Sequence, residues 1–216
     1  MNNKKIKAIL FDLDGVVLST DHYHFLAWKQ MADELAIPFT KTDNERLRGV
    51  SRMESLEIVL EKYTGAPLTA EEKVALAEKK NDAYRVYLRQ MSPSDVADEV
   101  RDTLRELRRR GYRLAIGSSS KNARFILSQT EMTDFFDAIA DGTDISRSKP
   151  DPEVFVKAAQ FVNTDPAECA VVEDAFAGIE AAVGGGMLPV AIGSAVDCPM
   201  AVHKLTTFSD LLKLFN

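Results

Sequence analysis

Residues 6–15 read Ile6-Lys7-Ala8-Ile9-Leu10-Phe11-Asp12-Leu13-Asp14-Gly15, an apolar run of strand-forming residues that ends in two carboxylates and a glycine. A short continuous apolar run is typical of a strand that is buried on both faces of a parallel sheet. Ligands of open α/β sheets bind beyond the carboxyl ends of the strands. We therefore expect Asp12 and Asp14 to lie at the mouth of a site.

Two carboxylates this close along the chain repel each other unless a cation or a proton intervenes. Mg²⁺ is a hard cation that prefers oxygen ligands and also binds phosphate, so the pair favours a magnesium site. The alternative is that both aspartates only cap a turn or a helix. The Asp-x-Asp pattern does not by itself decide between the two interpretations.

The composition is that of an ordinary soluble protein with enough apolar residues for a core. Of 216 residues, 45% are hydrophobic and 28% are charged, which suits one large domain or a core with a smaller insert. The net charge of −6 argues against a general nucleic-acid surface. Cys169 and Cys198 match no metal-binding spacing, and the N-terminal apolar run is too short for a signal peptide or a membrane span. We expect a cytoplasmic monomer without nucleic-acid or membrane partners.

The segment from residue 17 to residue 92 has helical periodicity and no strand signal. One helix face collects His24, Trp28, Met31 and Leu35. Two capping boxes start further helices at Ser51-Arg52-Met53-Glu54 and Thr69-Ala70-Glu71-Glu72. We expect a helical cap domain at 17–92, inserted into a core domain that consists of 1–16 and 93–216.

Strand and helix signals alternate after residue 93. The expected strands are 112–117, 136–140, 170–172 and 188–192. The expected helices are one that ends at Gly111, one after Asn122, one opening at Asp151-Pro152 with proline in its first position, one closed by Gly184-Gly185-Gly186, and one at 209–215. This alternation predicts an α/β fold with a doubly wound parallel sheet and a helical cap after the first strand.

Polar residues follow three of the expected strands. They are Asp12 and Asp14, then Ser118-Ser119-Ser120-Lys121-Asn122, then Glu173-Asp174, with Lys149-Pro150 between the last two groups. Carboxylates, a lysine and an anion-binding turn at one sheet edge suit metal-assisted phosphoryl transfer. Each piece alone has a simpler explanation: the serine-rich turn caps a helix, Lys149 is a solvated surface lysine, and Glu173-Asp174 is a turn.

Together these residues resemble the four motifs of the haloacid dehalogenase (HAD) superfamily of phosphotransferases, with its HAD-like Rossmannoid core. The motifs are Asp12-Leu13-Asp14-Gly15-Val16-Val17, Ser118, Lys149-Pro150 and Glu173-Asp174. Within it the chain is similar to the β-phosphoglucomutase family, through Thr20, Tyr23-His24-Phe25, Trp28-Lys29, Gly49-Val50-Ser51-Arg52, Ser55, Lys80-Asn81-Asp82 and Ser118-x-Ser120-Lys121-Asn122. The similarity covers nearly the whole chain and loosens after about Gly193.

The resemblance implies a role for each residue of the core domain. Asp12 is the expected nucleophile, which forms an aspartyl phosphate, and Asp14 the general acid and base. One Mg²⁺ is expected on Asp12, the Asp14 backbone carbonyl and Asp174, with support from Glu173. Lys149 and Ser118 are expected to bind the transferring phosphoryl group.

The resemblance also implies that the second phosphate of a bisphosphate intermediate is bound by Arg52 of the cap and by Ser120, Lys121 and Asn122 of the core domain. It makes His24, with Thr20 nearby, a hinge residue that positions Asp14. It adds Trp28, Gly49, Val50, Ser51, Ser55, Lys80 and Ser119 as substrate-binding candidates. The simpler alternatives are that Arg52 is a surface arginine paired with Glu54 or Glu57, that His24 and Trp28 form an ordinary core face, and that Lys80 is solvated.

As an activity, the resemblance implies Mg²⁺-dependent interconversion of β-D-glucose 1-phosphate and glucose 6-phosphate through β-glucose 1,6-bisphosphate. One alternative is a sugar-phosphate phosphatase, in which water attacks the aspartyl phosphate. Another is a non-catalytic phosphosugar-binding protein, which would need no nucleophile such as Asp12. The chain departs from the family pattern at Leu18, Ala175 and Ala97-Asp98.

Overall fold

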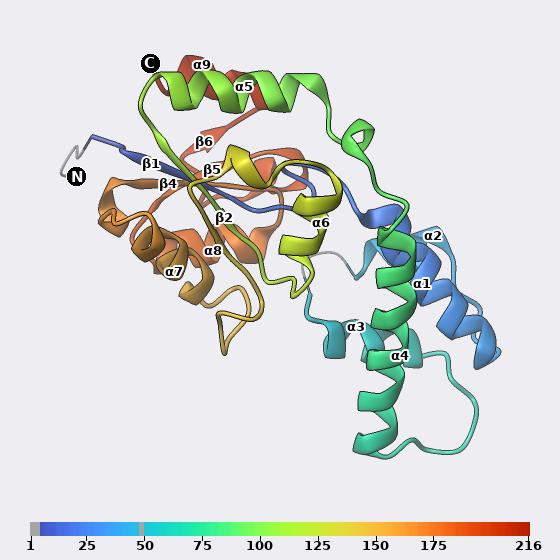
Figure 1. Cartoon of the computed structure of the whole chain (residues 1–216). Coiled ribbons are helices and arrows are strands. Elements are labelled where there is room, and N and C mark those ends of the chain that lie inside the picture. The colour runs from blue at the N-terminus through green and yellow to red at the C-terminus, as the bar shows by residue number, and fades with distance from the viewer. Residues whose placement is uncertain (1–4, 48–49) are drawn as a thin grey trace. The chain divides into compact units, whose positions relative to one another are not determined.

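The computed structural model describes residues 5–47 and 50–216, and the chain divides into two compact units (Figure 1). One unit consists of Met1–Ser19 and Ser92–Asn216, and the other is Thr20–Met91. Within the described ranges, every helix is too short or too polar to cross a lipid bilayer.

The first unit is built on a parallel sheet of six strands in the described part of the chain, in the order β3-β2-β1-β4-β5-β6. The strands are β1 (Ala8–Phe11), β2 (Arg113–Gly117), β3 (Ala138–Ala140), β4 (Cys169–Glu173), β5 (Leu188–Ala191) and β6 (His203–Lys204). β1 lies between β2 and β4, and all its residues are buried, as the apolar run predicts. The expected doubly wound parallel sheet is confirmed.

The strand register sets which residues meet at the carboxyl edge. Phe11, the last residue of β1, lies opposite Ile116 in β2 and Val172 in β4. The backbone N–H of Asp12 donates to the Val172 carbonyl at 3.0 Å, which continues the ladder by one residue. Asp12 and Glu173 therefore leave the sheet at the same level, although 160 positions of sequence lie between them.

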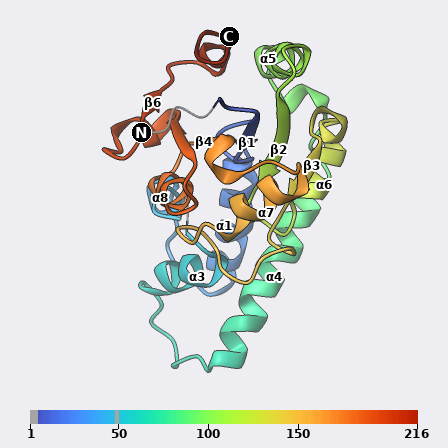
Figure 2. The same cartoon turned by 90° about the vertical axis from the view of Figure 1, so that its left-hand side faces the viewer.

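Helices cover both faces of the sheet (Figures 1 and 2). They are α5 (Asp98–Arg109), α6 (Ala123–Gln129), α7 (Glu153–Phe161), α8 (Phe176–Gly184) and α9 (Leu211–Leu214). Alternate β1 residues serve the two faces because side chains of a strand alternate in direction. Ala8 and Leu10 join the core formed with α7 and α8, whereas Phe11 stacks on Phe208 at 5.7 Å between ring centroids.

The second unit consists of helices in its described part. They are α1 (Asp21–Glu34), α2 (Lys41–Glu45), α3 (Arg52–Leu60) and α4 (Ala70–Leu88). Their apolar faces share one core that includes Trp28, Met31 and Leu56. Both expected capping boxes are confirmed: the hydroxyls of Ser51 and Thr69 accept the backbone N–H three residues on, and the Glu side chains there accept the N-cap N–H.

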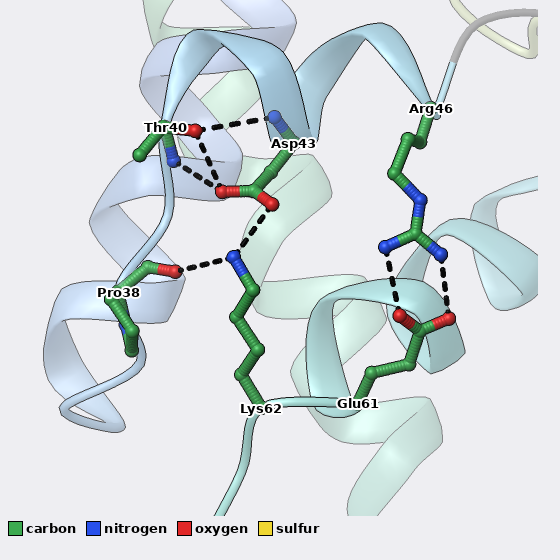
Figure 3. Close-up of polar contacts among 6 residues, drawn as sticks. All are labelled: Pro38, Thr40, Asp43, Arg46, Glu61 and Lys62. Atoms are coloured by element: carbon green, nitrogen blue, oxygen red, sulfur yellow. Dashed lines mark hydrogen bonds and ion pairs between the residues drawn. The ribbon is translucent and has the colours of Figure 1, made fainter.

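Ion pairs join α2 to the end of α3 (Figure 3). Lys62 donates to Asp43 at 2.6 Å, and Arg46 donates to both carboxylate oxygens of Glu61 at 2.8 Å each. Because Arg46 and Glu61 are about half exposed, water screens the attraction between their charges. The pair links positions on either side of the segment that contains Arg52.

Three local features differ from the sequence expectation. β6 was not expected, because two residues are too few to show a period. α2 was not expected either, although Thr40-x-x-Asp43 forms a third capping box. Pro152 is the N-cap of α7 rather than its first helical residue; proline lacks an N–H, so neither position costs a helical hydrogen bond.

The packing predicts a matched pair of stability effects on α5. Leu104 is fully buried, whereas the neighbouring Arg105 side chain is 62% exposed. Leu104→Ala should lower the free energy of unfolding of the sheet unit by about 2–5 kcal/mol, because it leaves a cavity. Arg105→Ala should change it by less than about 0.5 kcal/mol. Urea unfolding followed by circular dichroism measures both; equal losses would contradict the packing described here.

Candidate active site

The centre of the site is an ammonium group between two carboxylates. Asp12 follows β1 and Glu173 ends β4, and both are buried. Lys149, from the loop before α7, donates to Asp12 Oδ1 and, at 2.5 Å, to Glu173 Oε1. The Lys149 side chain is 9% exposed, and its Nζ lies 4.5 Å from the centroid of the Phe155 ring. The alternative that Lys149 is a solvated surface lysine is therefore wrong.

Burial and charge shift the pKa values of this group. Burial by itself lowers the pKa of Lys149, but the charges of Asp12 and Glu173 outweigh it and raise the pKa, so the ammonium stays charged. Burial is also the main reason that the pKa of Asp12 rises to about 8, against the opposing effect of Lys149. Burial, followed by the charges of Glu173 and Asp14, raises the pKa of Asp174 to about 7.

The Asp174 side chain lies against the turn that follows β1. Gly15 in that turn has φ +86°, and a Cβ there would come within 3.0 Å of the Asp174 carboxylate. A glycine thus allows the turn after Asp14 to approach the end of β4. Ser194 holds the other side of this residue, since its hydroxyl donates to the Asp174 carbonyl at 2.6 Å.

These donors fit a magnesium ion. Two carboxylates, Asp12 and Glu173, contact the ammonium group of Lys149. Burial is the main cause of the raised pKa values of Asp12 and Asp174, and the charges of neighbouring carboxylates raise both further. In the described residues, no three His, Cys, Asp or Glu side chains form a metal-binding group. The expected ligand set needs only two such side chains, Asp12 and Asp174, together with the Asp14 backbone carbonyl. All three supply oxygen atoms, which are the ligands that Mg²⁺ prefers.

Glu173 has both oxygens engaged by the protein. Oε1 accepts the Lys149 ammonium, and Oε2 accepts the backbone N–H of Ala175 at 2.8 Å. The carboxylate thus orients the lysine. Ala175, one of the departures from the family pattern, donates this bond from its backbone. Leu18, another departure, is buried, and its carbonyl accepts the Gly15 N–H at 2.7 Å.

A turn of hydroxyl groups follows β2. Ser118 is buried, its Oγ accepts the Ser120 N–H at 3.2 Å, and Ser120 Oγ accepts the Asn122 N–H at 3.2 Å. Ser119 Oγ is buried and has no hydrogen-bond partner among the described residues. Buried hydroxyls are normally hydrogen-bonded, so this oxygen is suited to a water or a ligand. Lys121, in the same turn, is exposed.

In the helical unit, Arg52 is the first residue of α3, directly after the N-cap Ser51. Its guanidinium donates to the side-chain carbonyl of Asn81 at 2.9 Å. Its two proposed surface partners are engaged elsewhere: Glu54 caps Ser51, and Glu57 pairs with Lys73. Burial lowers the pKa of Arg52.

His24, which is partly buried, and Lys80, which is buried, form a pair in the same unit. Lys80 Nζ lies 2.9 Å from His24 Nδ1, 4.5 Å from the Trp28 ring centroid and 4.8 Å from the Tyr84 ring centroid. Burial, then Lys80, then Arg52 hold the pKa of His24 well below its usual value, so the imidazole is neutral and accepts from the ammonium. Lys80 is 3% exposed, which rules out a solvated lysine.

The remaining candidate residues are buried in the helical unit, exposed to solvent, or outside the described residues. Trp28 is part of the core of the helical unit, and Ser55 is buried there, whereas Val50 is exposed. Thr20 is buried and accepts the Tyr84 hydroxyl at 2.9 Å. Gly49 lies outside the described residues.

Three contributing residues were not expected from the sequence. Phe155 lies beside Lys149, and Ser194 holds the Asp174 backbone. Tyr84 stacks on His24 with 4.1 Å between ring centroids. Only Tyr84 carried a signal, because it lies one helical turn after Lys80 and so shares its face.

Comparison with known proteins identifies the family of this chain. A model of the haloacid dehalogenase-like hydrolase family matches residues 6–186. The β-phosphoglucomutase of Bacillus subtilis strain 168 is 42% identical over 194 residues, covering 87% of this chain and 84% of that protein. A phosphorylated carbohydrates phosphatase of Thermotoga maritima is 27% identical, and the match covers 84% of this chain and 82% of that protein.

A solved structure is similar along nearly the whole chain. The crystal structure of β-phosphoglucomutase from Clostridium difficile superposes with a TM-score of 0.85 at 34% identity, covering 95% of this chain and 93% of that one. The family match, the relatives and the carboxylate–lysine arrangement at the sheet edge agree. The chain is therefore an enzyme that belongs to the haloacid dehalogenase-like hydrolase family.

Proposed function

We propose that this enzyme is a Mg²⁺-dependent β-phosphoglucomutase, which interconverts β-D-glucose 1-phosphate and glucose 6-phosphate. The observation that carries the proposal is the buried Lys149 ammonium between Asp12 and Glu173, beside Asp174. The B. subtilis relative, at 42% identity over most of the chain, supports the choice of reaction. Two buried free cysteines accord with a cytoplasmic setting.

In the proposed mechanism, Asp12 attacks phosphorus and forms an aspartyl phosphate, while Asp14 protonates the departing sugar oxygen. Asp14 then deprotonates the second sugar hydroxyl, which takes the phosphoryl group from Asp12. Lys149 and Ser118 stabilise the charge on the transferring group. Mg²⁺, held by Asp12, Asp174 and the Asp14 carbonyl, would supply further positive charge at the phosphoryl oxygens.

The helical unit, Thr20–Met91, is the proposed cap. The sequence predicts it at 17–92, inserted into a core domain that consists of 1–16 and 93–216. The part of the cap is to hold the second phosphate of β-glucose 1,6-bisphosphate. Arg52 at the start of α3 suits this role, because a guanidinium fork and a helix N-terminus both favour phosphate. We propose a role in phosphate binding for Ser120, Lys121 and Asn122 of the sheet unit as well.

A phosphatase is the second candidate, supported by the T. maritima relative at 27% identity. It would use the same Asp12 chemistry, with water instead of a sugar hydroxyl as the acceptor. The two functions differ in whether water reaches the aspartyl phosphate.

Phosphorus NMR separates the candidates. The enzyme with β-glucose 1-phosphate, Mg²⁺ and a trace of β-glucose 1,6-bisphosphate should produce glucose 6-phosphate without free phosphate. Release of stoichiometric free phosphate would support the phosphatase function instead of the mutase function, and no turnover would refute both. As a control, Asp12→Ala should lose about 10⁴-fold or more in kcat, because the nucleophile is gone. A variant that keeps turnover would show that the nucleophile is another residue.

Arg52→Ala tests the second-phosphate role. It should lower kcat/KM of the mutase reaction by about 10- to 100-fold. This is the change expected when a hydrogen bond between charged groups is lost. Hydrolysis of a simple monophosphate, which has no second phosphate, should change by less than about threefold. Arg46→Ala is the matched control, since Arg46 is paired with Glu61 and should not affect either reaction. Equal losses of both reactions in the Arg52 variant would contradict the role.

A further inference from the structure

Gly178 in α8 leaves room for the Glu173 carboxylate. Gly178 is buried, and a Cβ built on it would come within 3.0 Å of Cγ, Cδ and Oε1 of Glu173. Real Cβ atoms essentially never make such close contacts. The carboxylate therefore occupies the volume that any larger residue at position 178 would fill.

Glu173 cannot move aside without losing its contacts. It is 1% exposed, its Oε1 accepts Lys149 at 2.5 Å, and its Oε2 accepts the Ala175 N–H at 2.8 Å. A displaced carboxylate would leave the buried Lys149 ammonium and the partly buried Ala175 N–H without this acceptor, which is costly. A methyl group on Gly178 would thus act on Lys149 through Glu173.

We propose that Gly178 is a positioning residue for phosphoryl transfer, because the space that it leaves lets Glu173 aim Lys149 at Asp12. The inference rests on the proposed function, in which Lys149 and Asp12 carry the reaction. Lys149 has three N–H donors, and bonds to Asp12 and Glu173 fix two of them, so the direction of the third is set. Without Glu173 in place, only the bond to Asp12 would hold the ammonium group, and the directions of its other two N–H donors would not be fixed.

Helix propensity predicts that alanine at position 178 stabilises α8, whereas the steric conflict with Glu173 predicts a damaged site. Alanine is a better helix former than glycine, so a Gly→Ala change inside a helix normally stabilises it. Gly184 in the same helix supplies the matched control. A Cβ on Gly184 would meet Pro152 at 3.8 Å, an ordinary contact.

The experiment compares Gly178→Ala, Gly184→Ala, Glu173→Ala and the double variant Gly178→Ala/Glu173→Ala. We expect Gly178→Ala to lower kcat by about 10- to 100-fold with KM nearly unchanged, because a misplaced group mainly affects the transition state. Gly184→Ala should keep wild-type kcat. In the Glu173→Ala background, adding Gly178→Ala should not lower the remaining rate, because there is no carboxylate to displace. Melting temperatures of all four variants show which ones fold.

Wild-type kcat in Gly178→Ala, or an equal loss with and without Glu173, would overturn the proposal. If Gly178→Ala alone fails to fold while the double variant folds, the steric conflict with Glu173 is supported; if neither folds, the cost lies in helix packing and the proposal is wrong. A crystal structure of Gly178→Ala needs no substrate. It should show Lys149 Nζ beyond hydrogen-bond distance from Glu173, and it tests the inference even if wild-type enzyme lacks the proposed activity.

Discussion

The site depends on one buried interaction, the ammonium of Lys149 between the carboxylates of Asp12 and Glu173. A buried ion pair is stable only when its charges are matched and hydrogen-bonded. Here Lys149 is matched by two carboxylates, while Asp14 and Asp174 add further negative charge. Burial is the main reason that the pKa of Asp12 rises to about 8, and the charges of Glu173 and Asp174 raise it further. The arrangement is one that a second cation and an incoming phosphoryl group would complete.

The fold brings these groups together through backbone geometry. Parallel pairing of β1 with β4 sets Asp12 level with Glu173, and Gly15 lets the turn after β1 approach Asp174. The loop before α7 adds Lys149 from the face where Phe155 packs. Asp12 and Glu173 lie at the ends of two paired strands, which is an arrangement that holds functional groups in place.

Much of this could be predicted because its causes are local in the sequence. The apolar run before Asp12 predicts a central strand, and Ser51-x-x-Glu54 and Thr69-x-x-Glu72 predict helix starts, since each signal acts within a few residues. Tertiary packing could not be predicted in this way. Lys80 lies among charged residues and resembles a surface lysine, yet aromatic rings from α1 and α4 bury it. The partner of Glu173 likewise depends on where the loop bearing Lys149 folds back.

The most direct measurement is a crystal structure of the enzyme grown with Mg²⁺. We expect one metal ion in contact with the carboxylates of Asp12 and Asp174 and with the Asp14 carbonyl, while Lys149 keeps its bonds to Asp12 and Glu173. A metal ion bound elsewhere, or a Lys149 side chain turned to solvent with Asp12 and Glu173 apart, would contradict this expectation.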